Sequence, residues 1–188
     1  MNKMLIILIA VLYLIYSHFI NKYLDIIGKD HYDDEIRIYD LCHTHLPNYE
    51  KYEFIGNIYI IIVLLFIFKS SKSISIVFDL LSFIIPIFFI RSILTLINVL
   101  PKSSECNYNP HLAFINGGCY DKIFSGHSAF LFILTLLLNK YKIINFATLI
   151  ILNIVNVSII LLTRTHYTID IIVSFLVSYL MYSNNIRL

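Results

Sequence analysis

The sequence predicts an all-α integral membrane protein with six transmembrane helices and both termini in the cytosol. The composition predicts the class, because 59% of the 188 residues are hydrophobic and 14% are charged, against about 25% charged residues in an ordinary soluble domain. The apolar residues also form six long blocks instead of short periodic faces. A chain of this length is expected to form one domain, residues 1–188.

The six apolar blocks are each close to the roughly 20 residues that a helix needs to cross a bilayer. They lie at about 4–20, 54–68, 75–100, 123–138, 143–163 and 167–182. A cleaved signal peptide is the alternative for the first block, but no small-residue cleavage site follows it. Residues 21–53 carry eight acidic and four basic side chains, which predicts a polar loop outside the membrane.

Basic residues in the short loops predict the orientation. They stand at the amino terminus, after the second and fourth blocks, and at the carboxyl terminus: Lys3, Lys69, Lys72, Lys140, Lys142 and Arg187. In a six-span chain these four places share one side, which the positive-inside rule assigns to the cytosol. The loop 21–53 and the loops that precede the fourth and sixth blocks are therefore expected to face the lumen or the exterior.

Two histidine motifs carry the predicted chemistry, and both lie at the non-cytosolic ends of predicted spans. Ser125-Gly126-His127 opens the fourth span, and His166 precedes Asp170 by four residues, about one helical turn. A carboxylate one turn inside an apolar helix normally has a partner, so Asp170 is expected to hold the ring of His166. One imidazole would then attack phosphorus and the other would protonate the leaving oxygen. This chemistry requires no metal and no cofactor.

Further residues are predicted to bind substrate. Ser125 and Gly126 precede a helix whose free amides form an anion site, although the alternative is that Ser125 only caps that helix. Arg91 lies inside the third block, where it is expected to face a polar cavity and hold a lipid phosphate. Asp121 is expected to orient His127 or a substrate hydroxyl, with an ordinary loop carboxylate as the alternative.

The cysteines and the histidines of residues 40–45 form less specific patterns than the two histidine motifs. Cys106 and Cys119 fall in one predicted luminal loop and are candidates for a disulfide. The segment Asp40-Leu-Cys-His43-Thr-His45 invites a metal hypothesis, but no second cluster supplies ligands, so no metal site is predicted. No nucleic-acid-binding patch is present in the sequence.

The two histidine motifs resemble those of the sphingomyelin synthase family, which lies within the type 2 phosphatidic acid phosphatase superfamily. The segment Cys119-Tyr-Asp-Lys-Ile-Phe-Ser-Gly-His-Ser128 resembles the family pattern Cys-Gly-Asp-x-x-x-Ser-Gly-His-Thr, and His166-Tyr-Thr-Ile-Asp170 resembles its His-Tyr-Thr-x-Asp block. Tyr120 stands in place of the family glycine and Ser128 in place of the threonine.

The resemblance covers roughly residues 40–182 and includes Arg91, which resembles the family's third-helix arginine. It implies a six-span enzyme of sphingolipid metabolism, in the Golgi, endoplasmic reticulum or plasma membrane. Such an enzyme moves phosphocholine, or else phosphoethanolamine, from a glycerophospholipid to ceramide and releases diacylglycerol. By resemblance, His166 is the nucleophile, Asp170 orients it, and His127 acts first as the acid and then as the base.

Two alternatives to the transferase remain open. A lipid phosphate phosphatase of the same superfamily would carry Lys-x6-Arg-Pro before the Ser-Gly-His and Ser-Arg-x5-His-x3-Asp around the second histidine. Here Ser92 follows Arg91, and Ile160 stands six residues before His166, so both arginines of that pattern are missing. The other alternative is a non-catalytic membrane protein that binds lipid.

Overall fold

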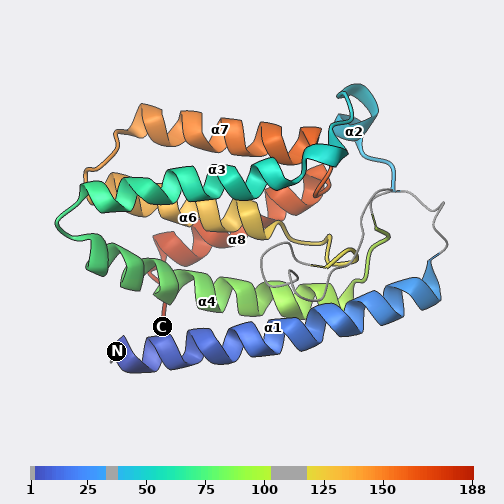
Figure 1. Cartoon of the computed structure of the whole chain (residues 1–188), viewed down its shortest axis with the longest axis horizontal. Coiled ribbons are helices and arrows are strands. Elements are labelled where there is room, and N and C mark those ends of the chain that lie inside the picture. Colours follow the sequence, from blue (N-terminus) through green and yellow to red (C-terminus); the bar gives the residue numbers. More distant parts are fainter. Residues whose placement is uncertain (1–2, 33–37, 103–117) are drawn as a thin grey trace.

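The computed structural model describes residues 3–32, 38–102 and 118–188, and within these residues it contains helices and loops but no strand (Figure 1). The long helical segments run side by side. They are α1 (Lys3–His31), α3 (Phe54–Leu64) continued by the 3-10 helix η2 (Leu65–Lys69), α4 (Ser73–Ile97), α6 (Gly126–Lys140), α7 (Phe146–Leu162) and α8 (Thr168–Ser183). Two short helices, α2 (Leu41–His45) and η1 (Glu50–Tyr52), precede α3.

Each predicted apolar block corresponds to one helical segment, but α1 is longer than its block. It continues through residues 21–31, which were predicted to lie in a polar loop. The continuation is stable because one of its faces is buried, with Leu24 fully inaccessible to solvent. An ion pair one turn apart, between Lys29 Nζ and Asp25 Oδ2 (2.6 Å), also supports the helix.

Several helices have the length and apolarity of membrane spans. α1 (29 residues), the segment Glu50–Lys69 (20 residues) and α4 (25 residues) are long enough to cross a bilayer, whereas the apolar helices α6, α7 and α8 have 15, 17 and 16 residues. Apolar side chains such as Leu12 and Phe68 point outward from the bundle and are more than half exposed. These features indicate a membrane protein; six crossings and cytosolic termini stay predictions.

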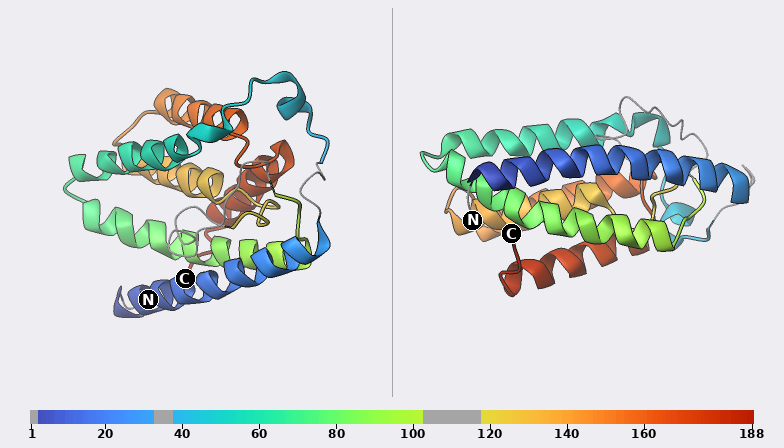
Figure 2. Two further views of the ribbon diagram at one scale, coloured as in Figure 1. Left: turned by 45° about the vertical axis from the view of Figure 1, so that its right-hand side comes forward. Right: turned by 90° about the horizontal axis from the view of Figure 1, so that it is seen from below.

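α6 is the central helix of the described bundle. It packs against α3, α4, α7 and α8, whereas α1 lies at the edge and packs along α4 (Figure 2). The fully buried leucines of α6 supply much of the apolar core. Because α6 begins at Gly126, its first turn places His127 at the end of the bundle near α2.

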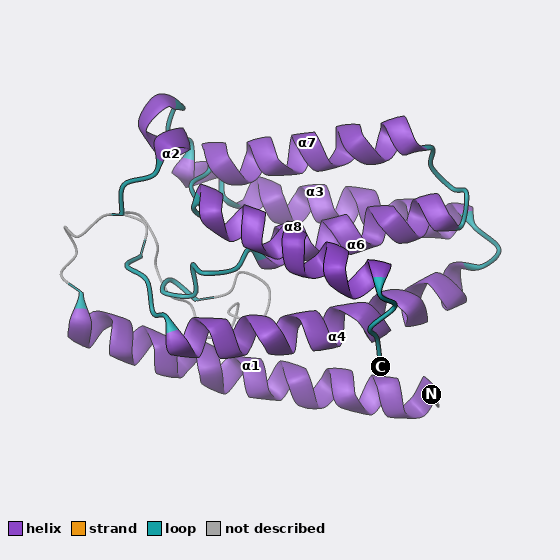
Figure 3. Ribbon diagram, turned by 180° about the vertical axis from the view of Figure 1, so that it is seen from behind, coloured by secondary structure: helices purple, strands orange, loops and turns teal. Residues whose placement is uncertain are grey.

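The opposite end of the bundle carries both termini (Figure 3). There Asp79 of α4 accepts hydrogen bonds from Lys140 Nζ (3.3 Å), Tyr141 Oη (3.1 Å) and Arg187 Nη1 (3.2 Å). Asp79 thus connects α4 with the end of α6 and with the carboxyl terminus, far from the histidine motifs.

Tyr120, in the segment before α6, packs against α1. Tyr120 is buried, and its ring occupies the space in which a Cβ atom of Gly28 would lie. A glycine is therefore required at position 28 because the aromatic ring approaches the helix backbone there.

The substitution Gly28→Ala is expected to destabilise the protein by about 1–3 kcal/mol, because the added methyl group overlaps the Tyr120 ring. Thermal unfolding of the purified variant in detergent would measure the effect. Gly118→Ala is the matched control, since its Cβ would lie at an ordinary contact distance of 3.6 Å from Asn21 of α1. Equal melting temperatures for both variants would contradict the proposed contact.

Candidate active site

The Ser-Gly-His motif forms the amino-terminal end of α6. The Ser125 hydroxyl accepts a hydrogen bond from the backbone N–H of Ser128 (3.2 Å). Ser125 therefore caps the helix, which is one of the two roles that were considered for it. The backbone N–H of Ser125 donates to the carbonyl oxygen of Asp170 (3.4 Å). This bond joins the first histidine motif directly to the second.

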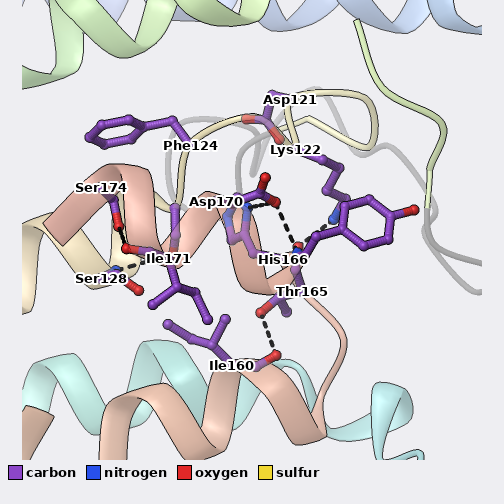
Figure 4. Close-up of polar contacts among 12 residues, drawn as sticks. Asp121, Lys122, Phe124, Ser128, Ile160, Thr165, His166, Asp170, Ile171 and Ser174 are labelled. Atoms are coloured by element: carbon purple, nitrogen blue, oxygen red, sulfur yellow. Dashed lines mark hydrogen bonds and ion pairs between the residues drawn. The ribbon is translucent and has the colours of Figure 1, made fainter. Parts of the chain in front are cut away.

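His166 and Asp170 lie together at the start of α8, as predicted. Asp170 Oδ2 is 3.4 Å from His166 Nδ1, and the carboxylate is fully buried (Figure 4). The same oxygen accepts a hydrogen bond from the backbone N–H of Tyr167 (2.9 Å). Asp170 therefore performs two tasks, since it caps the first turn of α8 and faces one nitrogen of the His166 ring.

The His166 ring is neutral at physiological pH. Burial and, after it, the positive charge of Lys122 lower the pKa of His166 to about 3. A neutral imidazole keeps a lone pair on one ring nitrogen, which nucleophilic attack requires.

His127 has a hydrogen-bond partner that was not predicted from the sequence. Its Nε2 atom forms a hydrogen bond of 2.8 Å with Oδ1 of Asn57, near the start of α3. Because an amide oxygen only accepts, this bond places a proton on Nε2. Gly56 lies beside the same ring, with its Cβ position 3.7 Å from His127 Cδ2. Asn57 carried no sequence signal, because nothing in its local sequence distinguishes it from other polar residues at a helix start.

Arg91 reaches the site from α4. Its guanidinium forms an ion pair with the carboxylate of Asp121, and its Nε donates to the carbonyl oxygen of Phe124 (3.2 Å). The structure therefore places Asp121 against Arg91, whereas the partner of His127 is Asn57. A substrate-binding role for Asp121 stays a prediction.

An apolar cavity of about 480 Å³ brings four of the predicted residues together. His127, His166 and Arg91 all line it, as does the predicted Gly126. Most of its remaining wall consists of apolar side chains from four helices: Ala10 and Leu14 of α1, Ile60 and Ile61 of α3, Ile84, Ile85 and Phe88 of α4, and Phe130 of α6. Ser125 does not belong to this wall, because its side chain is fully buried and engaged as a cap.

A second, polar cavity of about 350 Å³ touches His166 from another side. Charged and polar side chains dominate its wall, among them Asp40, His43, Glu50, Lys122 and Arg164. Among the residues that the structure describes, only His166 lines both cavities. The predicted nucleophile thus stands between an apolar chamber and a polar one.

Asp40 gives the polar cavity a fixed wall. Its carboxylate accepts hydrogen bonds from the backbone N–H (2.7 Å) and the hydroxyl (2.9 Å) of Thr168, and from the backbone N–H of His43 (3.0 Å). Burial opposes the charge, but these hydrogen bonds prevail and lower the pKa of Asp40 below its ordinary value. Asp40 therefore stays ionised and joins α2 to the first turn of α8.

The predictions about the disulfide and the metal site can be compared with the described residues only. Cys106 lies outside the described residues, so the predicted disulfide with Cys119 stays a prediction, and Cys42 is a free thiol. In the ranges 3–32, 38–102 and 118–188, no three His, Cys, Asp or Glu side chains are grouped to hold a metal ion.

Comparison with known proteins gives one family match. Residues 118–186 match the family described as PAP2 superfamily C-terminal, and no curated protein matches the chain significantly. The matched segment contains both histidine motifs and Asp170. The match supports the type 2 phosphatidic acid phosphatase superfamily, so over this segment the chain is similar to enzymes that act on membrane lipids as phosphatases or phosphotransferases.

Proposed function

We propose that the protein transfers a phospho-headgroup, phosphocholine or phosphoethanolamine, from a glycerophospholipid to ceramide. The observation that carries this proposal is the apolar cavity of about 480 Å³ with His127, His166 and Arg91 in its wall. Apolar side chains suit the acyl chains of a lipid, and a guanidinium suits its phosphate. The proposed site faces the non-cytosolic side of the membrane.

In the first half of the reaction, a ring nitrogen of His166 attacks the phosphorus of the donor lipid. The bond between phosphorus and the diacylglycerol oxygen breaks. The anionic phosphate of the bound donor favours the imidazolium form of His127, which gives its proton to that oxygen. Diacylglycerol leaves, and the headgroup phosphate is bound covalently to His166. Asp170, 3.4 Å from the ring, orients His166 and stabilises the positive charge that the ring acquires.

In the second half, the primary hydroxyl of ceramide replaces diacylglycerol in the apolar cavity. His127, now neutral, removes the hydroxyl proton while the oxygen attacks phosphorus. The bond between phosphorus and His166 breaks, and the sphingophospholipid leaves. Both histidines return to their starting protonation states, so the cycle consumes no cofactor.

A lipid phosphate phosphatase is the second candidate. The polar cavity favours it, because water in that cavity has access to His166 without passing the apolar chamber. The absence of the phosphatase arginine pattern around Arg91 and His166 favours the transferase. The two enzymes differ only in whether a lipid alcohol or water resolves the intermediate.

The purified full chain, reconstituted in vesicles of mixed phosphatidylcholine and phosphatidylethanolamine with a fluorescent ceramide, is expected to form a fluorescent sphingophospholipid. Mass spectrometry of the product identifies the transferred headgroup. With phosphatidic acid added to the vesicles, release of free phosphate or of a phosphorylated headgroup with no ceramide product would select the phosphatase. Lack of turnover with every lipid pair would contradict both enzymes and leave a non-catalytic lipid-binding protein.

A further inference from the structure

Lys122 is a buried cation beside the site that the proposed reaction does not yet use. Its residue is 7% exposed, and its side chain reaches past the start of α8 to the turn that holds His166 (Figure 4). There the Nζ atom donates to the carbonyl oxygen of Thr165 at 2.6 Å. Because Thr165 directly precedes His166, this bond fixes the ammonium group next to the proposed nucleophile.

The charges around His166 leave Lys122 as a cation available to an anion. The guanidinium of Arg91 is already paired with the carboxylate of Asp121. Asp170 Oδ2 lies 3.4 Å from the ring, and a donor phosphodiester brings a negative charge to the same place. Within the described ranges no carboxylate lies within ion-pair distance of the Lys122 ammonium, since its one hydrogen bond goes to a carbonyl oxygen. A buried cation without a paired anion is costly to maintain.

The ammonium group of Lys122 also has N–H donors that can bind a ligand. An ammonium group carries three N–H donors, and the Thr165 carbonyl takes one of them. Lys122 and His166 both line the polar cavity of about 350 Å³, so the remaining donors have access to the same space as the His166 ring. Phosphate oxygens are strong acceptors for such donors.

We propose that Lys122 binds a non-bridging oxygen of the headgroup phosphate and stabilises the charge on that oxygen during transfer. This role rests on the proposed function, because the phosphate concerned is the one that His166 attacks. It divides the labour between the cations: Arg91, paired with Asp121, contacts the phosphate from the apolar cavity, and Lys122 contacts it from the polar cavity. Preorganised donors of this kind lower the barrier to charge development in a dry site.

The same geometry connects Lys122 to the protonation of His166. The charged and titratable groups nearest the ring are Asp170 of α8, Arg91 of α4, His127 of α6, and Asp121 and Lys122 of the segment before α6. The polar cavity adds Asp40, His43, Glu50 and Arg164. Burial is the main reason that the pKa of His166 is lowered, and the charge of Lys122 is the next. Removing that charge is therefore expected to raise the pKa of His166 toward its ordinary value near 6.5.

Inorganic phosphate is the probe for this site, and the full-length protein in detergent is the sample. Phosphate is expected to raise the melting temperature of the wild type in a saturable way. Lys122→Met is expected to weaken phosphate binding by about tenfold or more, and Lys122→Arg by less than about threefold, because a charged hydrogen bond is worth about 1.5–3 kcal/mol. Lys72→Met, an exposed lysine at the other end of the bundle, serves as the control and should bind phosphate like the wild type.

The pH profile of transfer gives a readout that a structural role would not change. In Lys122→Met the acid limb of kcat/KM is expected to move to higher pH than in the wild type, while Lys122→Arg keeps the wild-type position. Unchanged phosphate affinity together with an unmoved acid limb would show that Lys122 only holds the Thr165 carbonyl. A wild type whose melting temperature does not rise with added phosphate would also overturn the proposal.

Failure of the proposed function is distinguishable from failure of this inference. Phosphate binding does not require transfer, so a wild type that binds phosphate through Lys122 but forms no ceramide product keeps the anion site and loses the transferase. If the wild type transfers headgroups but its phosphate affinity does not depend on Lys122, only the proposed role of this lysine is overturned.

If Lys122→Met does not fold, Lys122→Gln and the loss of phosphate binding by the wild type at high pH test the same charge. That loss should occur below the ordinary lysine pKa of 10.5, because burial lowers the pKa of Lys122.

Discussion

The variant His166→Ala is expected to lose headgroup transfer, with kcat/KM reduced by about 10³-fold or more. The reason is that the proposed covalent intermediate forms on this ring, which lines both the apolar and the polar cavity. No neighbouring group replaces it, because His127 is held by Asn57 at the start of α3. The measurement is the initial rate of fluorescent sphingophospholipid formation in vesicles.

Two controls make the result for His166→Ala specific. The exposed His31 at the end of α1 provides a matched His31→Ala variant, which should keep wild-type activity. His166→Ala also removes the packing of a buried ring, so its melting temperature is expected to fall, and the rates are compared at a temperature at which both proteins stay folded. Wild-type transfer by His166→Ala would remove His166 as the nucleophile.

The variant Asp170→Asn is expected to reduce kcat by about 10³- to 10⁴-fold, as charge removal does in comparable carboxylate–histidine pairs. The amide oxygen of asparagine can still accept the hydrogen bond from Tyr167, so the cap of α8 is retained. What is lost is the negative charge 3.4 Å from His166 Nδ1, which stabilises the imidazolium in the proposed intermediate. Single-turnover kinetics with a labelled donor measure the step directly.

The matched control for Asp170→Asn is Asp30→Asn, an exposed carboxylate near the end of α1. It should leave both transfer and stability unchanged. The proposed role of Asp170 predicts a loss in kcat with little change in KM, because the carboxylate acts on the ring and not on the lipid. A loss confined to KM, or a loss that follows a lower melting temperature, would show a structural role instead.

Much of the fold could be predicted from the sequence because apolar blocks of membrane length leave few alternatives. Each block forms one helical segment, and Pro86 lies inside α4 without ending it. The continuation of α1 through residues 21–31 could not be predicted in this way. Its charged surface resembles a loop, and its stability depends on Leu24 and Gly28, which pack against segments distant in the sequence.

The positions of some site residues could be predicted from the sequence, and the positions of others could not. The spacing of His166 and Asp170 fixed their proximity, because residues four apart share a helical face. Arg91 lines the apolar cavity, whereas a polar cavity was predicted for it; that an arginine within an apolar block turns into the bundle could be predicted, but the character of the cavity could not. The partners Asn57 and Lys122 were missed, because each reaches the site from a segment whose local sequence is unremarkable and whose position depends on the tertiary packing of α3 and α6.

The central claim is that a headgroup phosphate is bound covalently to His166 during transfer. The most direct measurement is mass spectrometry of the wild-type protein after incubation with phosphatidylcholine in the absence of ceramide, quenched at alkaline pH to preserve a bond between phosphorus and nitrogen. The account predicts a phosphocholine adduct on the peptide that contains His166, which disappears when ceramide is added. An adduct on any other residue, or product formation with no enzyme-bound headgroup at any time, would contradict it.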